Sequence, residues 1–155
     1  MEDAYRILHQ YFGYGTFRPG QEKLIQGILQ GRDVVGILPT GGGKSLCYQI
    51  PALSLPGLTL VISPLISLMK DQVDGLRELG ISAAKIDGQT EPVAYRDIMR
   101  SAFRGDLKLL YIAPERLAQE SFQRAVKNLP IALVAIDEAL SLIHISEPTR
   151  LLSIS

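Results

Sequence analysis

The feature that most constrains the fold of this 155-residue chain is a repeated alternation of short apolar runs with longer amphipathic segments. Most of the runs are continuously apolar, which is typical of parallel strands covered by helices on both faces. Strand–helix–strand repetition favours right-handed crossover connections. The sequence therefore predicts an α/β fold built on a parallel sheet. The predicted strands are Asp33–Leu38, Leu58–Ile62, Ile81–Ile86, Leu107–Ile112 and Ile131–Ile136.

Helical patterns fill much of the remaining chain. Two of them end at glycines, Gly80 and Gly105, which suit the left-handed conformation that follows many helices. A glycine- and proline-containing loop, Phe12–Gly20, separates the first two helices. The predicted helices are Asp3–Tyr11, Gln21–Gln30, Leu65–Leu79 and Pro92–Phe103, with a further helix after Ser45.

The composition indicates one soluble globular domain, with 46% hydrophobic and 21% charged residues. Sixteen basic and sixteen acidic side chains cancel, so a site for a polyanion must be local. The single cysteine, Cys47, favours a reducing compartment. No apolar run approaches the roughly 18 residues that span a bilayer. We therefore expect a cytoplasmic protein without a membrane partner.

A phosphate-binding loop is predicted where the strand Asp33–Leu38 runs into Pro-Thr-Gly-Gly-Gly-Lys-Ser and a helix. Glycines let backbone N–H groups surround phosphates, and the helix N-terminus favours negative charge. Lys44 is expected to reach the β- and γ-phosphates, and the Ser45 hydroxyl to bind magnesium. The strict motif has glycine where Leu38 stands. The alternative interpretation is a glycine-rich turn with an incidental lysine.

A carboxylate pair, Asp137-Glu138, ends the last predicted strand. In a nucleotide-hydrolysing site, one such carboxylate holds magnesium and the other orients and deprotonates the attacking water. We expect Asp137 at the metal and Glu138 as the general base. The alternative is that both acids face solvent or cap a helix.

Five sequence blocks follow one another along the chain: Phe12–Gln21, Leu38–Leu53, Val61–Val73, Leu109–Leu117 and Ala135–Ala139. Together and in this order, they resemble the first motor domain of RecQ helicases. The resemblance covers residues 1–139 and implies a RecA-like P-loop domain of an enzyme that unwinds DNA in the 3′ to 5′ direction. It implies ATP and Mg²⁺ as cofactors, single- and double-stranded DNA as partners, and a bacterial-type, nucleoid-associated role in DNA repair and recombination.

By position, the resemblance also implies an adenine site in the first block. Tyr14 would stack on the base, Arg18 would assist, and the amide of Gln21 would hydrogen-bond the adenine edge. From the residues alone, a loop packed by its own aromatics is the alternative. The resemblance completes the nucleotide-binding set with Thr40, Gly41, Gly42, Gly43, Lys44 and Ser45.

Two further segments resemble the parts of the family that track single-stranded DNA. Both follow predicted strands, and ligands of open α/β sheets bind at the carboxyl ends of strands. The expected DNA-binding residues are Ser63, Pro64, Lys70 and Arg116. On composition alone, Lys70 and Arg116 are solvated charges on helix surfaces.

The resemblance stops abruptly after Ala139. The family motif at the carboxylate block is Asp-Glu-Ala-His, and Leu140 stands at its fourth position. The stretch Leu140–Arg150 resembles the translated end of a sequencing-library adapter. We therefore expect residues 1–139 to be a partial helicase ATP-binding domain and residues 140–155 to be a non-native tail.

This interpretation has physical consequences. In motors of this class, the strand after the Asp-Glu strand inserts beside the phosphate-loop strand, so its loss is expected to leave two interior edges unpaired. The second motor domain, with its arginine, and the zinc-binding and winged-helix elements would lie outside the chain. The chain itself is then expected to be inactive in unwinding.

Two other functions stay open from the sequence. One is a catalytically inactive nucleotide-binding fragment, and the other is an unrelated P-loop ATPase or kinase. The ordered blocks Phe12–Gln21 and Val61–Val73 favour the helicase.

Overall fold

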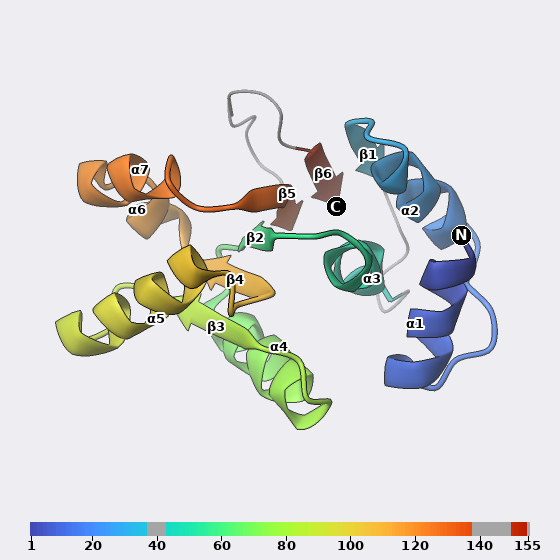
Figure 1. Ribbon diagram of the computed structural model, residues 1–155, viewed down its shortest axis with the longest axis horizontal. Helices are drawn as coiled ribbons and strands as arrows, with labels where there is room; N and C mark the ends of the chain where they lie inside the picture. Colours follow the sequence, from blue (N-terminus) through green and yellow to red (C-terminus); the bar gives the residue numbers. More distant parts are fainter. Residues whose placement is uncertain (37–42, 138–149, 155) are drawn as a thin grey trace.

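The computed structural model describes residues 1–36, 43–137 and 150–154, and these form one parallel sheet flanked by helices (Figure 1). The sheet has six strands in the order β1-β6-β5-β2-β4-β3, and every strand pair is parallel. The predicted parallel α/β fold is confirmed. The strands are β1 (Val34–Gly36), β2 (Leu58–Ile62), β3 (Ala83–Ile86), β4 (Leu109–Ile112), β5 (Ile131–Asp137) and β6 (Arg150–Ile154).

The helices agree with the amphipathic patterns to within one or two residues where helices were predicted. α5 begins with Pro92 in its first turn and ends at Gly105, whose φ of 83° is left-handed. None of the helices in the described part of the chain is long and apolar enough to cross a membrane. The helices are α1 (Glu2–Phe12), α2 (Gln21–Leu29), α3 (Leu46–Ser54), α4 (Ile66–Glu78), α5 (Pro92–Arg104), α6 (Pro114–Leu117) and α7 (Glu120–Val126).

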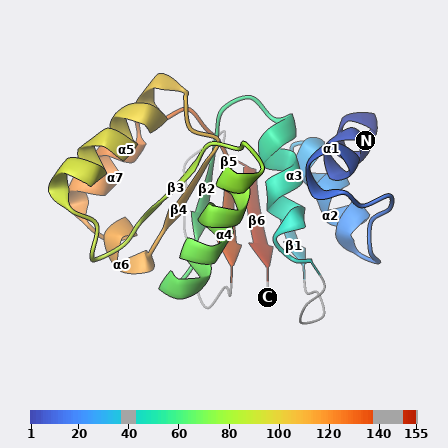
Figure 2. The same cartoon turned by 90° about the horizontal axis from the view of Figure 1, so that it is seen from below.

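The sheet separates two hydrophobic cores, because successive residues of a strand point to opposite faces. On one face, Val61, Tyr111 and Ala135 pack with side chains of α3 and α4. On the other face, neighbouring strand residues such as Leu110 pack with α5 and α7, including the fully buried Phe122. Figure 2 shows these helices on the two sides of the strands. Burial on both faces explains why the strands are continuously apolar.

The helices that precede the sheet form a third cluster with α3. Ile7 of α1, Ile25 of α2 and Ile50 of α3 are all buried there. α2 also lies very close to β1, since a Cβ added at Gly36 would overlap the Leu24 side chain. The packing of α1 and α2 places the loop between them beside the start of α3.

One expectation about the sheet is wrong. β6 lies between β1 and β5 and pairs with both, so these two strands are not left with unpaired interior edges. Strand pairing needs only an extended segment that offers backbone N–H and C=O groups to each neighbour, and residues 150–154 provide it. The non-native origin of residues 140–155 stays a prediction.

Candidate functional site

The carboxyl ends of the strands meet at one edge of the sheet. Ile62, Ile112 and Ile86 are in register across β2, β4 and β3. At the same edge, Gly36 at the end of β1 and Asp137 at the end of β5 both pair with Ile154 of β6. The loops that follow these strands carry most of the predicted site residues. This edge is where open α/β sheets bind their ligands.

A cavity of about 140 Å³ lies beside the start of α3. The residues predicted to bind adenine line this cavity. Gln21 connects two segments that form the cavity wall, the loop before α2 and the start of α3. Its buried amide accepts a hydrogen bond from the Arg18 N–H at 2.8 Å and donates one to the Gly43 carbonyl at 2.9 Å. Tyr14 is 53% exposed and free to receive a flat ring on its face. The lining residues are Tyr14, Thr16, Arg18, Gln21, Gly43 and Leu46.

The described part of the phosphate loop leads directly into α3. Gly43 has a φ of 75°, and a Cβ there would come within 2.6 Å of the Gln21 amide nitrogen, so glycine suits both the backbone and the space. The Ser45 carbonyl accepts the Gln49 N–H at 2.9 Å, which starts the helix behind the loop. Lys44 and Ser45 are half-buried. Thr40, Gly41 and Gly42 lie outside the described residues.

Asp137 is the last residue of β5 and is half-buried. It points to the α3 side of the sheet, since Ala135 and Leu133, two and four residues earlier, pack in the α3 core. Burial raises the pKa of Tyr111 to about 12, and the negative charge of Asp137 contributes to that rise. Burial likewise raises the pKa of Tyr48 on α3, and the Asp137 charge adds to it. Glu138 lies outside the described residues.

The chemistry of these groups fits a magnesium nucleotide. Magnesium keeps several waters and is usually held by one or two protein oxygens together with substrate phosphates. Asp137 and the Ser45 hydroxyl are oxygen ligands of that kind. Within the described residues, no group of three or more His, Cys, Asp or Glu side chains forms a protein-only metal site. A site completed by phosphate oxygens is therefore the one that these residues suit.

The first predicted DNA segment begins at the end of β2. Ser63 is buried, its N–H donates to the Ile112 carbonyl at 3.2 Å, and its hydroxyl accepts the Leu65 N–H at 3.3 Å. Pro64 is exposed. Lys70, on α4, is exposed and pairs with Asp74 at 2.7 Å, a bond that raises the pKa of Lys70. Pro64 and Lys70 are therefore at the surface, while Ser63 shapes the backbone beneath them.

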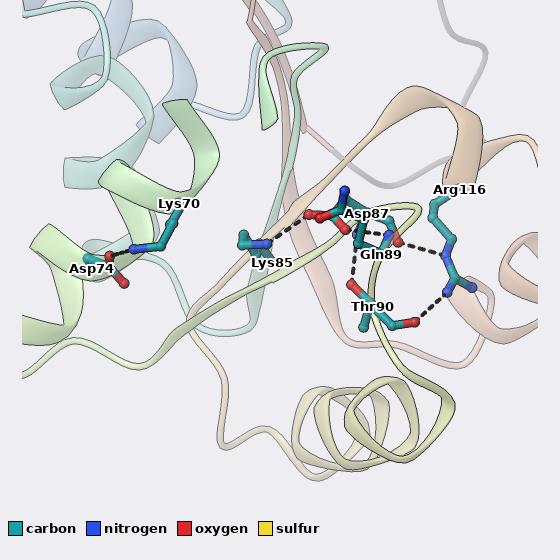
Figure 3. Close-up of polar contacts among 7 residues, drawn as sticks. All are labelled: Lys70, Asp74, Lys85, Asp87, Gln89, Thr90 and Arg116. Atoms are coloured by element: carbon teal, nitrogen blue, oxygen red, sulfur yellow. Dashed lines mark hydrogen bonds and ion pairs between the residues drawn. The ribbon is translucent and has the colours of Figure 1, made fainter. Parts of the chain in front are cut away.

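Arg116 occupies a different setting from the one expected of a surface charge. Its guanidinium donates to the carbonyls of Asp87 and Thr90 (Figure 3). It also donates to the side chain of Gln119. It also lies 4.9 Å from the centre of the Tyr95 ring. The sequence interpretation did not identify the turn Asp87–Thr90 that these bonds hold. An Asp-Gly-Gln-Thr stretch directly after a strand is the signal that identifies such a turn.

A buried polar cluster behind the phosphate loop was also missed. The Tyr48 and Tyr111 hydroxyls are 3.0 Å apart, and the Gln49 amide donates to Tyr111 at 3.3 Å and to Gln72 at 2.7 Å. The cluster links α3, which follows the phosphate loop, with β4 and with α4. No local pattern marks these residues, because their partners lie far apart in the sequence.

Comparison with known proteins agrees with this arrangement. The sequence model of the DEAD/DEAH box helicase family matches residues 18–148. The chain is 49% identical over 138 residues to the ATP-dependent DNA helicase RecQ of Pasteurella multocida, and 50% identical over 137 residues to that of Bacillus subtilis. These alignments cover 89% and 88% of the chain but only 22% and 23% of the relatives. The chain thus spans about a fifth of the length of the relatives it matches.

Solved helicase structures share the fold. A DUF1998 helicase, MrfA, bound to DNA and AMPPNP has a TM-score of 0.73 at 22% identity, over 88% of this chain and 20% of that one. A hypothetical ATP-dependent RNA helicase from Sulfolobus tokodaii has a TM-score of 0.68 at 21% identity, over 99% of this chain and 50% of that one. A DEAD/DEAH helicase domain implies ATP and a divalent metal ion as ligands. With its RecQ-like sequence and its RecA-like sheet, the chain belongs to the DEAD/DEAH box helicase family.

Proposed function

We propose that this chain is the ATP-binding part of the first motor domain of a RecQ-like helicase, which couples ATP hydrolysis to unwinding of DNA in the 3′ to 5′ direction. The relatives that carry this name support the proposal. The single observation that carries it is the shared sheet edge. Gly36, which precedes the phosphate loop, and Asp137 pair with the same residue of β6, and the lined cavity opens beside Gly43.

In the proposed nucleotide site, each group performs a task that its chemistry allows. Tyr14 stacks on adenine, Arg18 lies beside it, and the Gln21 amide recognises the base edge. Lys44 holds the terminal phosphates, and the backbone N–H groups of residues 40–45 bind the phosphate oxygens. The Ser45 hydroxyl and Asp137 hold Mg²⁺, which neutralises charge on the phosphates when bound.

Glu138 is proposed as the general base. It directly follows Asp137, so it lies in sequence where the strand leaves the sheet at the phosphate edge. From this position, its carboxylate orients the attacking water and accepts a proton from it. Glu138→Gln keeps the shape of the side chain, but its carboxamide cannot accept that proton.

Single-stranded DNA is proposed to run along the loops after β2 and β4. Ser63 and Pro64 are level with the end of β4, because the Ser63 N–H bonds the Ile112 carbonyl. Lys70 lies on the first turns of α4 beyond them, and Arg116 lies beyond β4. Phosphate contacts from hydroxyl, backbone and cationic groups of this kind fix the register of a strand without reading its sequence.

The first experiment measures nucleotide binding to the 155-residue chain with a fluorescent ATP analogue and Mg²⁺. The wild-type chain is expected to bind, and Lys44→Met to lose at least about tenfold in affinity, since that ratio corresponds to roughly 1.4 kcal/mol. Lys127→Met is the matched control, because Lys127 is exposed at the end of α7. Equal binding by the wild-type chain and Lys44→Met would contradict the proposed site.

Two alternatives are separated by measurements on the 155-residue chain and on the full-length protein. Nucleotide binding that needs Lys44, without turnover, would indicate a nucleotide-binding fragment. We expect this result, and no strand separation, for the 155-residue chain alone. Hydrolysis by the full-length protein that single-stranded DNA accelerates would favour the helicase over a kinase that acts on a small molecule.

We propose that the protein works in the cytoplasm, in association with the nucleoid. A single cysteine that is buried suits a reducing compartment, and a DNA substrate places the enzyme at the chromosome. Zinc is proposed only for parts of the full-length protein outside this chain.

A further inference from the structure

Three neighbouring strands of the sheet end at the same level, and each is followed by an ordered connection. β2 leads to Ser63, β4 to Ala113 and β3 to Asp87. Backbone bonds fix their relative height, since the Ser63 N–H donates to the Ile112 carbonyl and the Ala113 N–H to the Ile86 carbonyl. The proposed DNA path after β2 and β4 therefore continues to the connection after β3. The connection after β3 is thus a third segment beside the proposed DNA path, and none of the predicted DNA-binding residues lies in it.

The connection after β3 is a tight turn, Asp87–Thr90, whose polar groups bond within the turn. The Asp87 carboxylate is 1% exposed, pairs with Lys85 at 2.7 Å, and accepts the Gln89 N–H at 2.8 Å. The Thr90 hydroxyl accepts the Asp87 N–H at 3.0 Å. Two residues of the turn, Gly88 and Gln89, remain exposed, and a Cβ at Gly88 would meet no atom within 4 Å. The bonds of Asp87 and Thr90 thus fix the turn, while Gly88 and Gln89 stay open to solvent.

Arg116 holds the outer side of this turn. Its Nε donates to the Asp87 carbonyl at 3.1 Å and its Nη2 to the Thr90 carbonyl at 3.2 Å, so one guanidinium spans both ends of the turn (Figure 3). Nη1 donates to Gln119 at 3.2 Å, and the Tyr95 ring lies under the guanidinium at 4.9 Å. Three of the five N–H donors of Arg116 are thereby used on the protein itself.

We propose that Arg116 acts on single-stranded DNA indirectly, as a positioning residue that holds the turn Asp87–Thr90 at the sheet edge so that Gly88 and Gln89 meet the strand. The inference rests on the proposed function, since it deepens the proposed DNA path. It differs from the expectation of a direct phosphate contact. Arginine presents a rigid fork, and two carbonyls of one turn match that fork, whereas a lysine offers a single point charge.

Direct and indirect action predict different salt dependence. Each phosphate that a cation neutralises on a single strand contributes about 0.7 to the slope of log affinity against log salt concentration. Loss of a direct contact lowers both the affinity and this slope. Loss of a positioning residue lowers the affinity and leaves the slope unchanged, because the same number of phosphates is neutralised.

The experiment uses the isotopically labelled 155-residue chain and an oligodeoxythymidylate, with binding and amide hydrogen exchange followed by NMR. Arg116→Gln removes the charge and the fork, Arg116→Lys removes only the fork, and Tyr95→Leu removes the ring and alters no charge. Arg124→Gln is the matched control, because the Arg124 side chain is 74% exposed on α7. Arg124 pairs only loosely with Glu120, at 3.9 Å.

We expect Arg116→Gln and Arg116→Lys to speed exchange of the Gln89 and Thr90 amides at least tenfold. Both are also expected to weaken oligonucleotide binding several-fold with an unchanged salt slope, and Tyr95→Leu to shift both quantities less in the same direction. Arg124→Gln is expected to change neither. A salt slope lower by about 0.7 in Arg116→Gln, with affinity restored in Arg116→Lys, would show a direct phosphate contact and overturn the inference.

Different results would contradict the positioning role of Arg116 and the proposed DNA path. Unchanged amide exchange in both Arg116 variants, while the wild-type chain binds the oligonucleotide, would overturn the inference alone. Absence of any binding by the wild-type chain would overturn the proposed DNA path, and the inference would fall with it. Faster amide exchange together with weaker binding at constant slope is the only combination that supports both.

Discussion

Gly36 and Asp137 lie level with each other on opposite sides of one strand, since both pair with Ile154 of β6. Two strand spacings separate their backbones by roughly 10 Å. Gly36, a few residues before the phosphate loop, and Asp137, the last residue of β5, therefore lie at the same edge of the sheet with one strand between them. A gap of that width has room for phosphates and a hydrated cation. It is also narrow enough for the phosphate loop and the Asp137 carboxylate to contact them from the two sides.

This relationship predicts a magnesium-dependent effect at Asp137. Asp137→Asn removes the charge and keeps the shape of the side chain, so nucleotide affinity is expected to fall at least about tenfold with Mg²⁺. In EDTA the variant and the wild-type chain are expected to bind similarly, because no cation is present for the carboxylate to hold. Titration of a fluorescent ATP analogue measures both. Asp106→Asn, at an exposed position after α5, is the control, and an equal loss in EDTA would argue against a metal role.

Gln21 is predicted to stabilise the fold as well as the nucleotide site. Gln21→Ala leaves the Arg18 N–H and the Gly43 carbonyl without their side-chain partner, which is expected to cost about 1–3 kcal/mol. Urea unfolding measures this loss, and nucleotide titration is expected to show a weaker preference for adenine over guanine. Gln26→Ala is the control on the exposed side of the same helix. Full stability in Gln21→Ala would mean that the two hydrogen bonds contribute nothing net.

The tyrosine pair is predicted to show strong coupling. Tyr111→Phe removes an acceptor from the Gln49 amide and a partner from Tyr48, and is expected to destabilise the protein by about 1–2 kcal/mol. Tyr48→Phe is expected to cost a similar amount. The double variant is expected to lose less than the sum of the two, because neither hydroxyl is then left buried and unpaired. A double-mutant cycle of unfolding free energies tests this, and strict additivity would contradict it.

Asp87 is predicted to contribute to stability at neutral pH and not in acid. The Lys85 ammonium holds the pKa of Asp87 below its usual range, with help from the Gln89 N–H and Thr90. The folded state thus favours the ionised carboxylate, and its contribution is full above the unfolded pKa of about 3.9. The contribution is lost as pH falls through the lower folded value. Asp87→Asn is expected to reduce the drop in unfolding free energy between pH 7 and pH 3, and an unchanged drop would contradict this.

Cys47 is predicted to be unreactive while the protein is folded. Burial raises the pKa of its thiol to about 12, so almost no thiolate exists at neutral pH. A thiol reagent is expected to label the native chain far more slowly than the urea-unfolded chain. The labelling rate in water then reports opening of the α3 core. Rapid labelling of native protein would show that the helix behind the phosphate loop opens readily.

Much of the sheet was predictable because its strands are buried on both faces. β2 matches its predicted run Leu58–Ile62, and β4 ends at the predicted Ile112. β3 is shorter than the predicted run, since it begins at Ala83 while Ser82 bonds the neighbouring Lys108 backbone. The short helices α6 and α7 were not predicted, because four and seven residues are too few to establish a helical period.

The candidate site was predictable where its residues are close together in the sequence. It was less predictable where it depends on contacts between residues that are far apart in the sequence. Tyr14 and Arg18 lie in one loop, and Gln21 begins the helix that follows it. All three line one cavity, which also includes the unpredicted Thr16 and Leu46. The contacts of Arg116 are with the turn Asp87–Thr90, which follows β3, and with the Tyr95 ring on α5. No local sequence pattern around Arg116 contains that information.

The position of β6 also has a consequence for how the protein is made. Among the described strands, β1 pairs only with β6, and residues 37–149 separate the two strands in the sequence. As the ribosome releases the polypeptide from its N-terminus, none of the other described strands can pair with β1 until residues 150–154 emerge. The nascent chain therefore carries an open strand edge while residues 37–149 are made, which exposes β1 to mispairing until β6 pairs with it.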